Sequence, residues 1–280
     1  MSVLLAVLAR IALWVGAMCL VAGVAIVGPR RLYEFAHEIG PRLREARTPI
    51  AVLVGVVVLS AVGRGPLQTV SEIVGVRLTG TIYALEGEFV AWVQATFVAP
   101  ELTIYFSWVY VYGYVFLLVF PFIAYGALSD TTTLRRLLLA YALNYGIGLV
   151  IYTLVLAYGP RNVMPDVVTS LLYTFDPDFQ VLTAEVNEHT NVFPSLHTSL
   201  AVTAGLFAAL TWEEYPAWTP IAVWLALSVT VSTMYLGIHW LVDVIGGIGL
   251  AVACVYLSHR LVEPTDECDV DADDAVPVAD

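Results

Sequence analysis

The sequence predicts an all-α fold, a polytopic membrane helical bundle of about six or seven transmembrane helices. Composition is the first reason, because 59% of the 280 residues are hydrophobic and the mean hydropathy is +0.82. Soluble domains contain only roughly 45–50% apolar residues. The second reason is that apolar runs long enough to cross a bilayer recur along the chain. The length suits one helical bundle rather than a series of domains.

The apolar runs divide the chain into four regions. They cover residues 3–28, 48–63, 103–127, 136–158, 196–212, 218–236 and 239–259, and the second and fifth are short. The first run lacks the basic start of a cleavable signal, so we expect a retained membrane helix. The regions that we expect are N-terminal transmembrane helices (1–63), an amphipathic interfacial segment (64–100), the bundle that carries the chemistry (101–261) and an acidic disordered tail (262–280).

The charged residues exclude several classes of function. The net charge is −12, and eight of the 24 acidic residues lie among the last 18. The twelve basic residues are all arginine, and this acidic, lysine-free composition resembles that of haloarchaeal proteins. A retinal Schiff base needs a lysine and is therefore excluded. The arginines are few and scattered, so we expect no nucleic-acid binding.

Arginine placement predicts the orientation of the bundle, because cytoplasmic loops are enriched in basic residues. With seven spans and the N-terminus outside, eight arginines lie inside: Arg30, Arg31, Arg42, Arg44, Arg47, Arg135, Arg136 and Arg260. The acidic tail is then cytoplasmic. Residues 160–197 and the turn at 237–239 lie together on the extracellular face of the cell membrane.

A histidine and an aspartate stand four residues apart near the end of the apolar region. On a helix, His239 and Asp243 lie on one face, so the carboxylate can hold one ring nitrogen as a donor. The other nitrogen is then available as a base or a nucleophile. Ionisable residues in a membrane mark functional sites by default, although a polar pair that joins two helices is an equally ordinary interpretation.

A second histidine follows a proline and a serine. Pro194 is suited to the first turn of a helix, where its missing N–H has no consequence. The amides that follow, with the helix dipole, form an anion site that suits phosphate, and the Ser195 hydroxyl adds a donor. His197 then lies where it can protonate a leaving oxygen. An ordinary helix start with a surface histidine remains the alternative.

Together the two stretches can carry out phosphoryl transfer. They occupy the open ends of one expected helical hairpin and can therefore meet. His239 attacks phosphorus, Asp243 stabilises the charge that develops on the ring, and His197 acts as general acid and then as general base. The mechanism needs no metal and no cofactor.

These stretches resemble the type 2 phosphatidic acid phosphatase and haloperoxidase superfamily, whose pattern is K-x6-R-P, P-S-G-H and S-R-x5-H-x3-D. The second part matches as Pro-Ser-Leu-His at 194–197, with Leu196 in place of glycine. The third part matches at 232–243, with Thr233 in place of arginine. The resemblance covers roughly residues 100–260 and implies a phosphatase-type core within the bundle.

The resemblance also implies phosphate-binding residues. Arg161 is our candidate for the arginine of the first part, although Leu154 and Asn162 stand where the family has lysine and proline. A lone arginine at a membrane boundary is also a common anchor. The full set of expected phosphate ligands, of which two act through their backbone, is Arg161, Ser195, Leu196, Thr198, Ser232, Thr233 and Asn191.

The departures from the pattern resemble one branch most closely, the inositol phosphorylceramide synthase (aureobasidin-resistance) branch. Members of that branch transfer a phosphorylated head group from a lipid to another alcohol. The resemblance therefore implies a membrane enzyme that acts on a phospholipid or polyprenyl phosphate, as a phosphatase or as a phosphotransferase. An inactive lipid-binding relative and a transporter remain alternatives, and no protein partner can be inferred.

Aromatic residues alternate at the start of the third apolar run. Trp108, Tyr110, Tyr112 and Tyr114 are expected to pack within the bundle and anchor it at the membrane interface, and a role in lining a lipid groove is the alternative.

Overall fold

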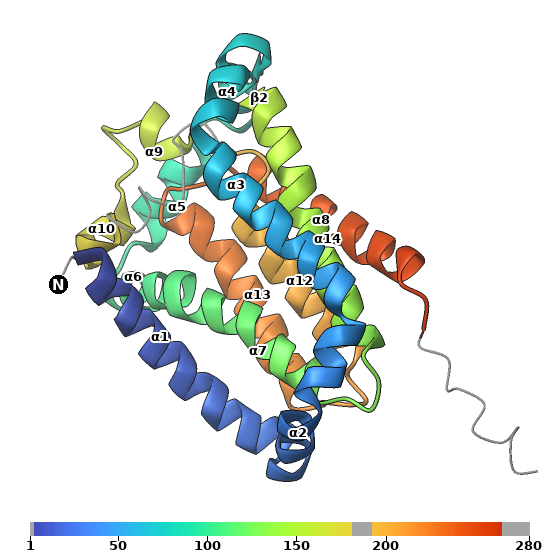
Figure 1. Ribbon diagram of the computed structural model, residues 1–280. Helices are drawn as coiled ribbons and strands as arrows, with labels where there is room; N and C mark the ends of the chain where they lie inside the picture. Colours follow the sequence, from blue (N-terminus) through green and yellow to red (C-terminus); the bar gives the residue numbers. More distant parts are fainter. Residues whose placement is uncertain (1–2, 181–191, 265–280) are drawn as a thin grey trace, which may run out of the picture.

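The computed structural model describes residues 3–180 and 192–264, and it confirms the all-α prediction (Figure 1). The helices are α1 (Val3–Ala22), η1 (Gly23–Val27), α2 (Pro29–Glu45), α3 (Arg47–Val74), α4 (Thr79–Glu86), α5 (Phe89–Phe97), α6 (Pro100–Trp108), η2 (Val109–Gly113), α7 (Tyr114–Gly126), α8 (Thr132–Leu154), α9 (Pro160–Val163), α10 (Leu171–Phe175), α12 (Leu196–Leu210), α13 (Trp218–Tyr235) and α14 (Leu241–Leu261). Two short strands, β1 (Val76–Arg77) and β2 (Val155–Leu156), pair in parallel. The expected ligand Asn191 and the tail from residue 265 lie outside the described residues.

The protein is a multi-pass membrane protein with five or six candidate spans in the described residues, where the sequence predicts about six or seven. Five stretches are long and apolar enough: Val3–Val27, Pro100–Gly126, Thr132–Leu154, Trp218–Tyr235 and Leu241–Leu261. A sixth exists only if the pair Pro29–Glu45 and Arg47–Gly63, bent by 75°, forms one span. The expected run 196–212 becomes α12, whose 15 residues are short for a span.

The third helix extends beyond the run that the sequence predicts. We expected a membrane span to end at residue 63, before the Arg-Gly-Pro sequence, but α3 continues through Pro66 to Val74. It packs extensively along α8, and this contact outweighs the local preference for a break. Its outer face is apolar, and Val62 is 75% exposed, as a lipid-facing side chain would be.

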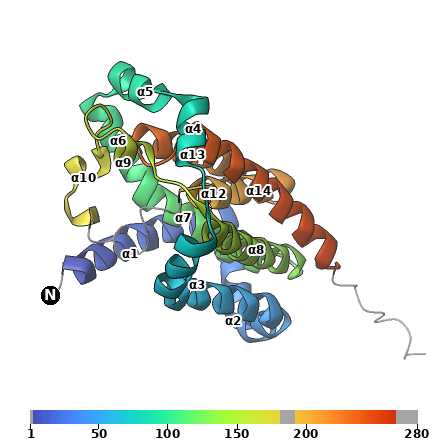
Figure 2. The same cartoon turned by 90° about the horizontal axis from the view of Figure 1, so that it is seen from above.

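The short helix α12 lies at the centre of the bundle, against α13, α14 and α8 (Figure 2). Buried polar groups fix its position on α8. Asn144 Nδ2 donates to Thr203 Oγ1 at 3.1 Å, and the Ser199 hydroxyl donates to Asn144 Oδ1. All three residues have no exposed surface. A buried polar group without a partner is costly, so this network favours one register of α12 along α8.

The site lies at the opposite end of the bundle from Arg42 and Arg136. At one end, Arg42 Nη1 donates to Gly126 O at 3.1 Å and Arg136 Nε donates to Val262 O at 3.2 Å. At the other end of α8, the Tyr152 hydroxyl donates to Pro194 O at 3.0 Å. Arg136 and Tyr152 are separated by about 24 Å along the helix, at 1.5 Å per residue. Figure 1 shows α2 at the basic end and α4 at the other.

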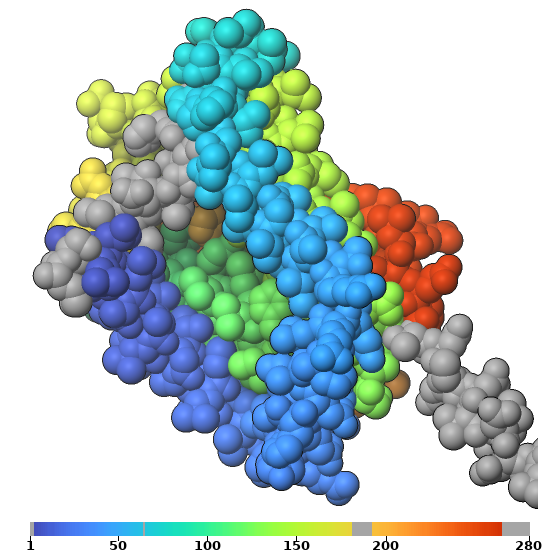
Figure 3. Space-filling view, in the orientation of Figure 1, coloured from blue at the N-terminus to red at the C-terminus, as the bar shows by residue number. Residues whose placement is uncertain are grey.

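The surface is hollowed between α1 and α3. In Figure 3 these two blue helices stand apart, and the green part of the chain, which contains η2 and α7, is visible between them. Both flanking helices carry exposed apolar side chains, such as Leu13 at 73% exposure. The hollow therefore opens on a surface suited to lipid.

Helices α12 and α14 approach each other closely because α14 has glycine at the contact. A Cβ atom on Gly247 would lie 2.5 Å from Ser195 O, and one on Gly246 would lie 2.8 Å from the Phe193 ring. Gly249, on the same helix, has open space around it. The contact at Gly247 is with backbone, which cannot move aside as a flexible side chain can.

We expect Gly247→Ala to destabilise the protein by about 1–3 kcal/mol, because α14 must move away from the start of α12. Gly249→Ala is the matched control. It adds the same methyl group to the same helix and should leave stability unchanged or raise it by up to about 1 kcal/mol. Thermal unfolding in detergent measures both, and equal unfolding temperatures for the two variants would contradict the close approach.

Candidate active site

A tight turn between α13 and α14 presents His239. Gly237 has a φ of +74°, and a Cβ there would lie 2.8 Å from Val168 Cγ1, so the turn requires glycine. The amides of Ile238 and His239 both donate to Thr233 O, at 3.0 and 3.1 Å. His239 thus precedes α14 rather than lying on it. We expected His239 and Asp243 to lie on one face of a helix. This prediction is wrong for His239, because the turn continues to Trp240 and α14 begins after it.

The His239–Asp243 contact forms nevertheless. Nδ1 of His239 lies 3.4 Å from Oδ2 of Asp243, and the two residues are 2% and 0% exposed. The same Oδ2 accepts the Trp240 amide at 2.8 Å, which holds the carboxylate at the start of α14. With Nδ1 facing the carboxylate, Nε2 of His239 is left to act as a base or nucleophile.

The second histidine lies at the start of α12. Ser195 is the N-cap residue, and its Oγ accepts the Thr198 amide at 3.3 Å. Pro194 therefore precedes the cap. It does not lie in the first turn of the helix, where we expected it from the sequence. The ring of His197 lies against Tyr110 and Tyr114, with centroids 4.5 Å apart in both cases. These two tyrosines were expected to pack and anchor, but they position His197.

A backbone hydrogen bond joins the two histidine-bearing segments. The Ser195 amide donates to Asp243 O at 3.0 Å, between the first residues of α12 and of α14. His197 consequently lies within electrostatic reach of His239. Leu196, which replaces the glycine of the family pattern, packs against Gly148 of α8 and is accommodated there. The pairing of the two motifs therefore follows from direct contact between helix starts.

Arg161 lies close to this site. Its amide donates to Gly237 O at 3.2 Å, which places α9 against the His239 turn. Its guanidinium lies 5.0 Å above the Tyr173 ring and within electrostatic reach of Tyr110, the tyrosine stacked on His197. Nη1 is buried and has no hydrogen-bond partner among the described residues. A guanidinium with a buried, unpartnered donor is suited to an anionic ligand.

The remaining expected ligands differ in what their hydroxyls do. Oγ1 of Thr198 is buried and unpartnered within the described part of the chain. By contrast, the Ser232 hydroxyl donates to Val229 O at 2.6 Å and the Thr233 hydroxyl to Thr230 O at 2.8 Å. These two hydroxyls are therefore bonded within α13, and either would have to rotate to reach a phosphate.

Helices α4 and α5 supply contacts that were not predicted from the sequence. Glu86 accepts the Leu241 amide at the start of α14, at 2.9 Å. Gln94 donates to Thr169 O and Tyr235 O, at 2.9 and 3.0 Å, and accepts the Thr169 amide at 2.8 Å. Both are polar residues within an otherwise apolar, amphipathic stretch. A polar residue among apolar ones indicates that Glu86 and Gln94 have polar partners. It does not indicate which distant backbone groups those partners are.

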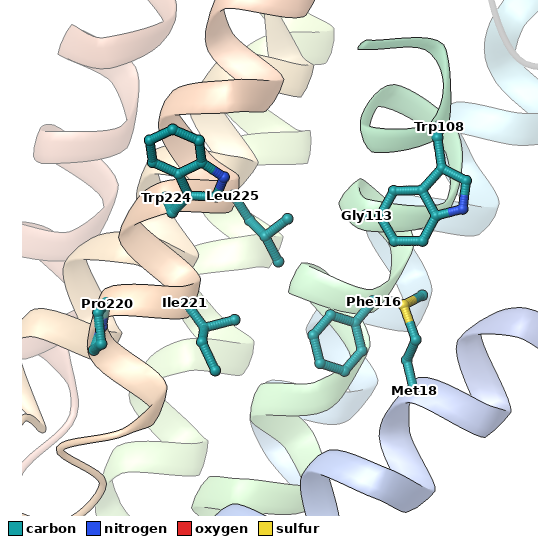
Figure 4. A pocket seen from close by; sticks show the side chains of 8 residues that line it. All are labelled: Met18, Trp108, Gly113, Phe116, Pro220, Ile221, Trp224 and Leu225. Carbon is teal, nitrogen blue, oxygen red and sulfur yellow. The ribbon is translucent and has the colours of Figure 1, made fainter. Parts of the chain in front are cut away.

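A separate apolar groove lies between α1, α7 and α13 (Figure 4). Its lining contains none of the histidine, aspartate or arginine side chains of the site. The residues that line it are Met18, Trp108, Gly113, Phe116, Pro220, Ile221, Trp224 and Leu225. The groove is suited to an apolar chain and not to the chemistry of a phosphate ester.

Comparison with known families identifies the fold. A family model described as PAP2 superfamily matches residues 82–257, which is well over half of the chain. The chain belongs to the PAP2 superfamily. No curated protein and no solved structure matches it. Membership of the PAP2 superfamily supports a phosphatase-type lipid enzyme. The matched range includes α5 and the end of α4, so the contacts of Glu86 and Gln94 belong to the PAP2 region.

We expect Gln94→Leu to destabilise the PAP2 region. Leucine fills a similar volume but removes the partner of the Thr169 amide and of Tyr235 O, at up to about 1–3 kcal/mol each. Thr169 O keeps the Leu171 amide, at 3.0 Å. The matched control is Gln68→Leu on α3, where the side chain is only partly buried. Thermal unfolding should show a lower midpoint for Gln94→Leu alone. Equal midpoints in the two variants would mean that Gln94 does not hold the Thr169 and Tyr235 segments together.

Proposed function

We propose that this protein is an integral-membrane lipid phosphatase or phosphotransferase that forms a phosphohistidine at His239. The observation that carries the proposal is the direct contact between the two helix starts, through the Ser195 amide and Asp243 O. It brings a histidine with a carboxylate partner to a second histidine and a buried arginine.

The first chemical step transfers the phosphoryl group to the enzyme. Nε2 of His239 attacks phosphorus with its lone pair, and the bond from phosphorus to the lipid oxygen breaks. The leaving oxygen takes a proton from His197, and Asp243 stabilises the positive charge on the His239 ring. Arg161, the Thr198 hydroxyl and the start of α12 stabilise the charge on the phosphoryl oxygens.

The second step regenerates His239. An acceptor hydroxyl gives its proton to His197 while its oxygen attacks phosphorus, and the N–P bond breaks. If the acceptor is water, the protein is a phosphatase. If the acceptor is an alcohol, the protein is a phosphotransferase. It is a head-group transferase where the phosphorus held by His239 still carries a head group such as inositol. The burial of His239, at 2% exposure, favours an acceptor that is bound rather than bulk water, so we retain the transferase as the second candidate.

A lipid substrate is supported by the surroundings of the site. Tyr114, which contacts His197, lies on α7, and the α7 surface is open towards the bilayer between α1 and α3 (Figure 3). A phospholipid or a polyprenyl phosphate can therefore approach from the membrane. Because eight of the twelve arginines lie in the segments at the opposite end of the bundle, we infer that the site is on the extracellular face and the acidic tail in the cytoplasm.

The proposal predicts an activity that depends on His239. Wild-type protein in high-salt detergent should release phosphate from at least one lipid phosphate, or form inositol phosphate when inositol is added. His239→Ala should lower this activity by at least about a thousandfold, because the nucleophile is removed. A panel of lipid phosphates with and without inositol, analysed for phosphate, inositol phosphate and the released lipid, measures both.

The matched control is His259→Ala, at the end of α14 remote from His239, which should retain wild-type activity. Free phosphate from wild type without inositol identifies a phosphatase, and a product that requires inositol identifies a transferase. Equal activity in wild type and His239→Ala would exclude His239 as the nucleophile. No activity from the wild type on any lipid phosphate would favour an inactive relative.

A further inference from the structure

The first turn of α14 is capped by two carboxylates. The Trp240 amide donates to Asp243 Oδ2 at 2.8 Å. The amides of Leu241 and Val242 donate to the two oxygens of Glu86, at 2.9 and 3.1 Å. Amides in the first turn of a helix have no partner within the helix, and a negative charge there is favoured by the helix dipole. Glu86 thus completes a cap that Asp243 alone does not provide.

The fold places Glu86 at this position from both ends of α4. At the start of the helix, Thr79 Oγ1 accepts the Tyr158 amide at 3.1 Å. Near the end, the Tyr83 ring lies 6.2 Å from the buried Trp240 ring, edge to face. Gly87 then ends the helix with a φ of +62°. The carboxylate therefore reaches α14 from a docked helix and not from a flexible loop.

The consequence concerns Asp243. Its Oδ2 holds the Trp240 amide and faces His239 Nδ1, so its position determines the orientation of the imidazole. Without Glu86, the Leu241 and Val242 amides would lack acceptors at a half-buried position. Asp243 is the neighbouring carboxylate, and these amides would draw it away from His239.

We infer that Glu86 is a positioning residue: it satisfies the first turn of α14 and thereby keeps Asp243 on His239. The inference rests on the proposed phosphotransfer by His239, and it adds a residue from the interfacial segment to the machinery. Glu86 itself does not touch the substrate in this account.

The charge of Glu86 is sensitive to pH. Burial is the main influence and raises the pKa of the Glu86 carboxyl. The Leu241 and Val242 amides lower this pKa, and the nearby charge of Asp243 raises it. As the pH falls through the raised pKa, Glu86 becomes neutral and loses part of its capacity to accept. Wild type then comes to resemble a variant with glutamine at this position.

The test compares Glu86→Gln with Glu88→Gln, which removes the charge of an exposed neighbour. Glutamine has one acceptor oxygen, so one amide of α14 loses its partner. We expect Glu86→Gln to lower kcat by roughly tenfold with little change in KM, and Glu88→Gln to behave as wild type. The ratio of wild-type to Glu86→Gln activity should shrink as the pH falls, because only wild type titrates at residue 86.

Hydrogen exchange provides a measurement that does not depend on turnover. In Glu86→Gln the Trp240 amide, which Glu86 does not contact, should exchange faster because Asp243 has moved. Unchanged exchange at Trp240, or unchanged kcat in an active enzyme, would overturn the inference. If wild type turns over no lipid phosphate, the proposed function fails, and exchange at Trp240 alone then decides whether Glu86 positions Asp243.

Discussion

The hydrogen bond from the Ser195 amide to Asp243 O, at 3.0 Å, is the contact on which the rest of the site depends. It joins the starts of two helices whose histidines are 42 residues apart in the sequence. Unsatisfied amides are costly where water is scarce, so each helix start stabilises the other. The bond requires close approach, which explains why Gly247 faces Ser195 O. Glycine also allows close contact between α12 and α8, because Leu196 packs directly on Gly148.

The two helix starts differ in charge, and this difference assigns their roles. Two carboxylates, from Glu86 and Asp243, occupy the start of α14, so an anion is disfavoured there. The start of α12 carries the Ser195 cap, and its His197 stacks on Tyr110, which lies within electrostatic reach of Arg161. On the proposed mechanism the phosphate therefore binds towards α12, and the α14 segment supplies the nucleophile. The helix dipole favours phosphate at α12 and carboxylates at α14 by the same physical effect.

Composition and run length were sufficient to predict a helical membrane protein, because hydrocarbon thickness fixes the length of a span. The spacing of His239 and Asp243 predicted their contact, but it did not reveal the turn at Gly237 that places His239 before α14. No spacing rule could link Glu86 to Leu241, 155 residues away, or Gln94 to Tyr235, 141 residues away. Such contacts depend on how α4 and α5 dock, which is a tertiary property. The end of α3 was missed for a related reason, since packing on α8 extends the helix past Pro66.

The central claim is that phosphorus becomes bonded to His239 during turnover. The most direct measurement is to mix the enzyme with a lipid substrate labelled at phosphorus, quench it in alkali, and locate the label by peptide mass spectrometry. The account predicts a label on His239 that survives alkali and is lost in acid, and that is absent from His239→Ala. Product formation by wild type with no label on His239, or with the label on another residue, would contradict the account.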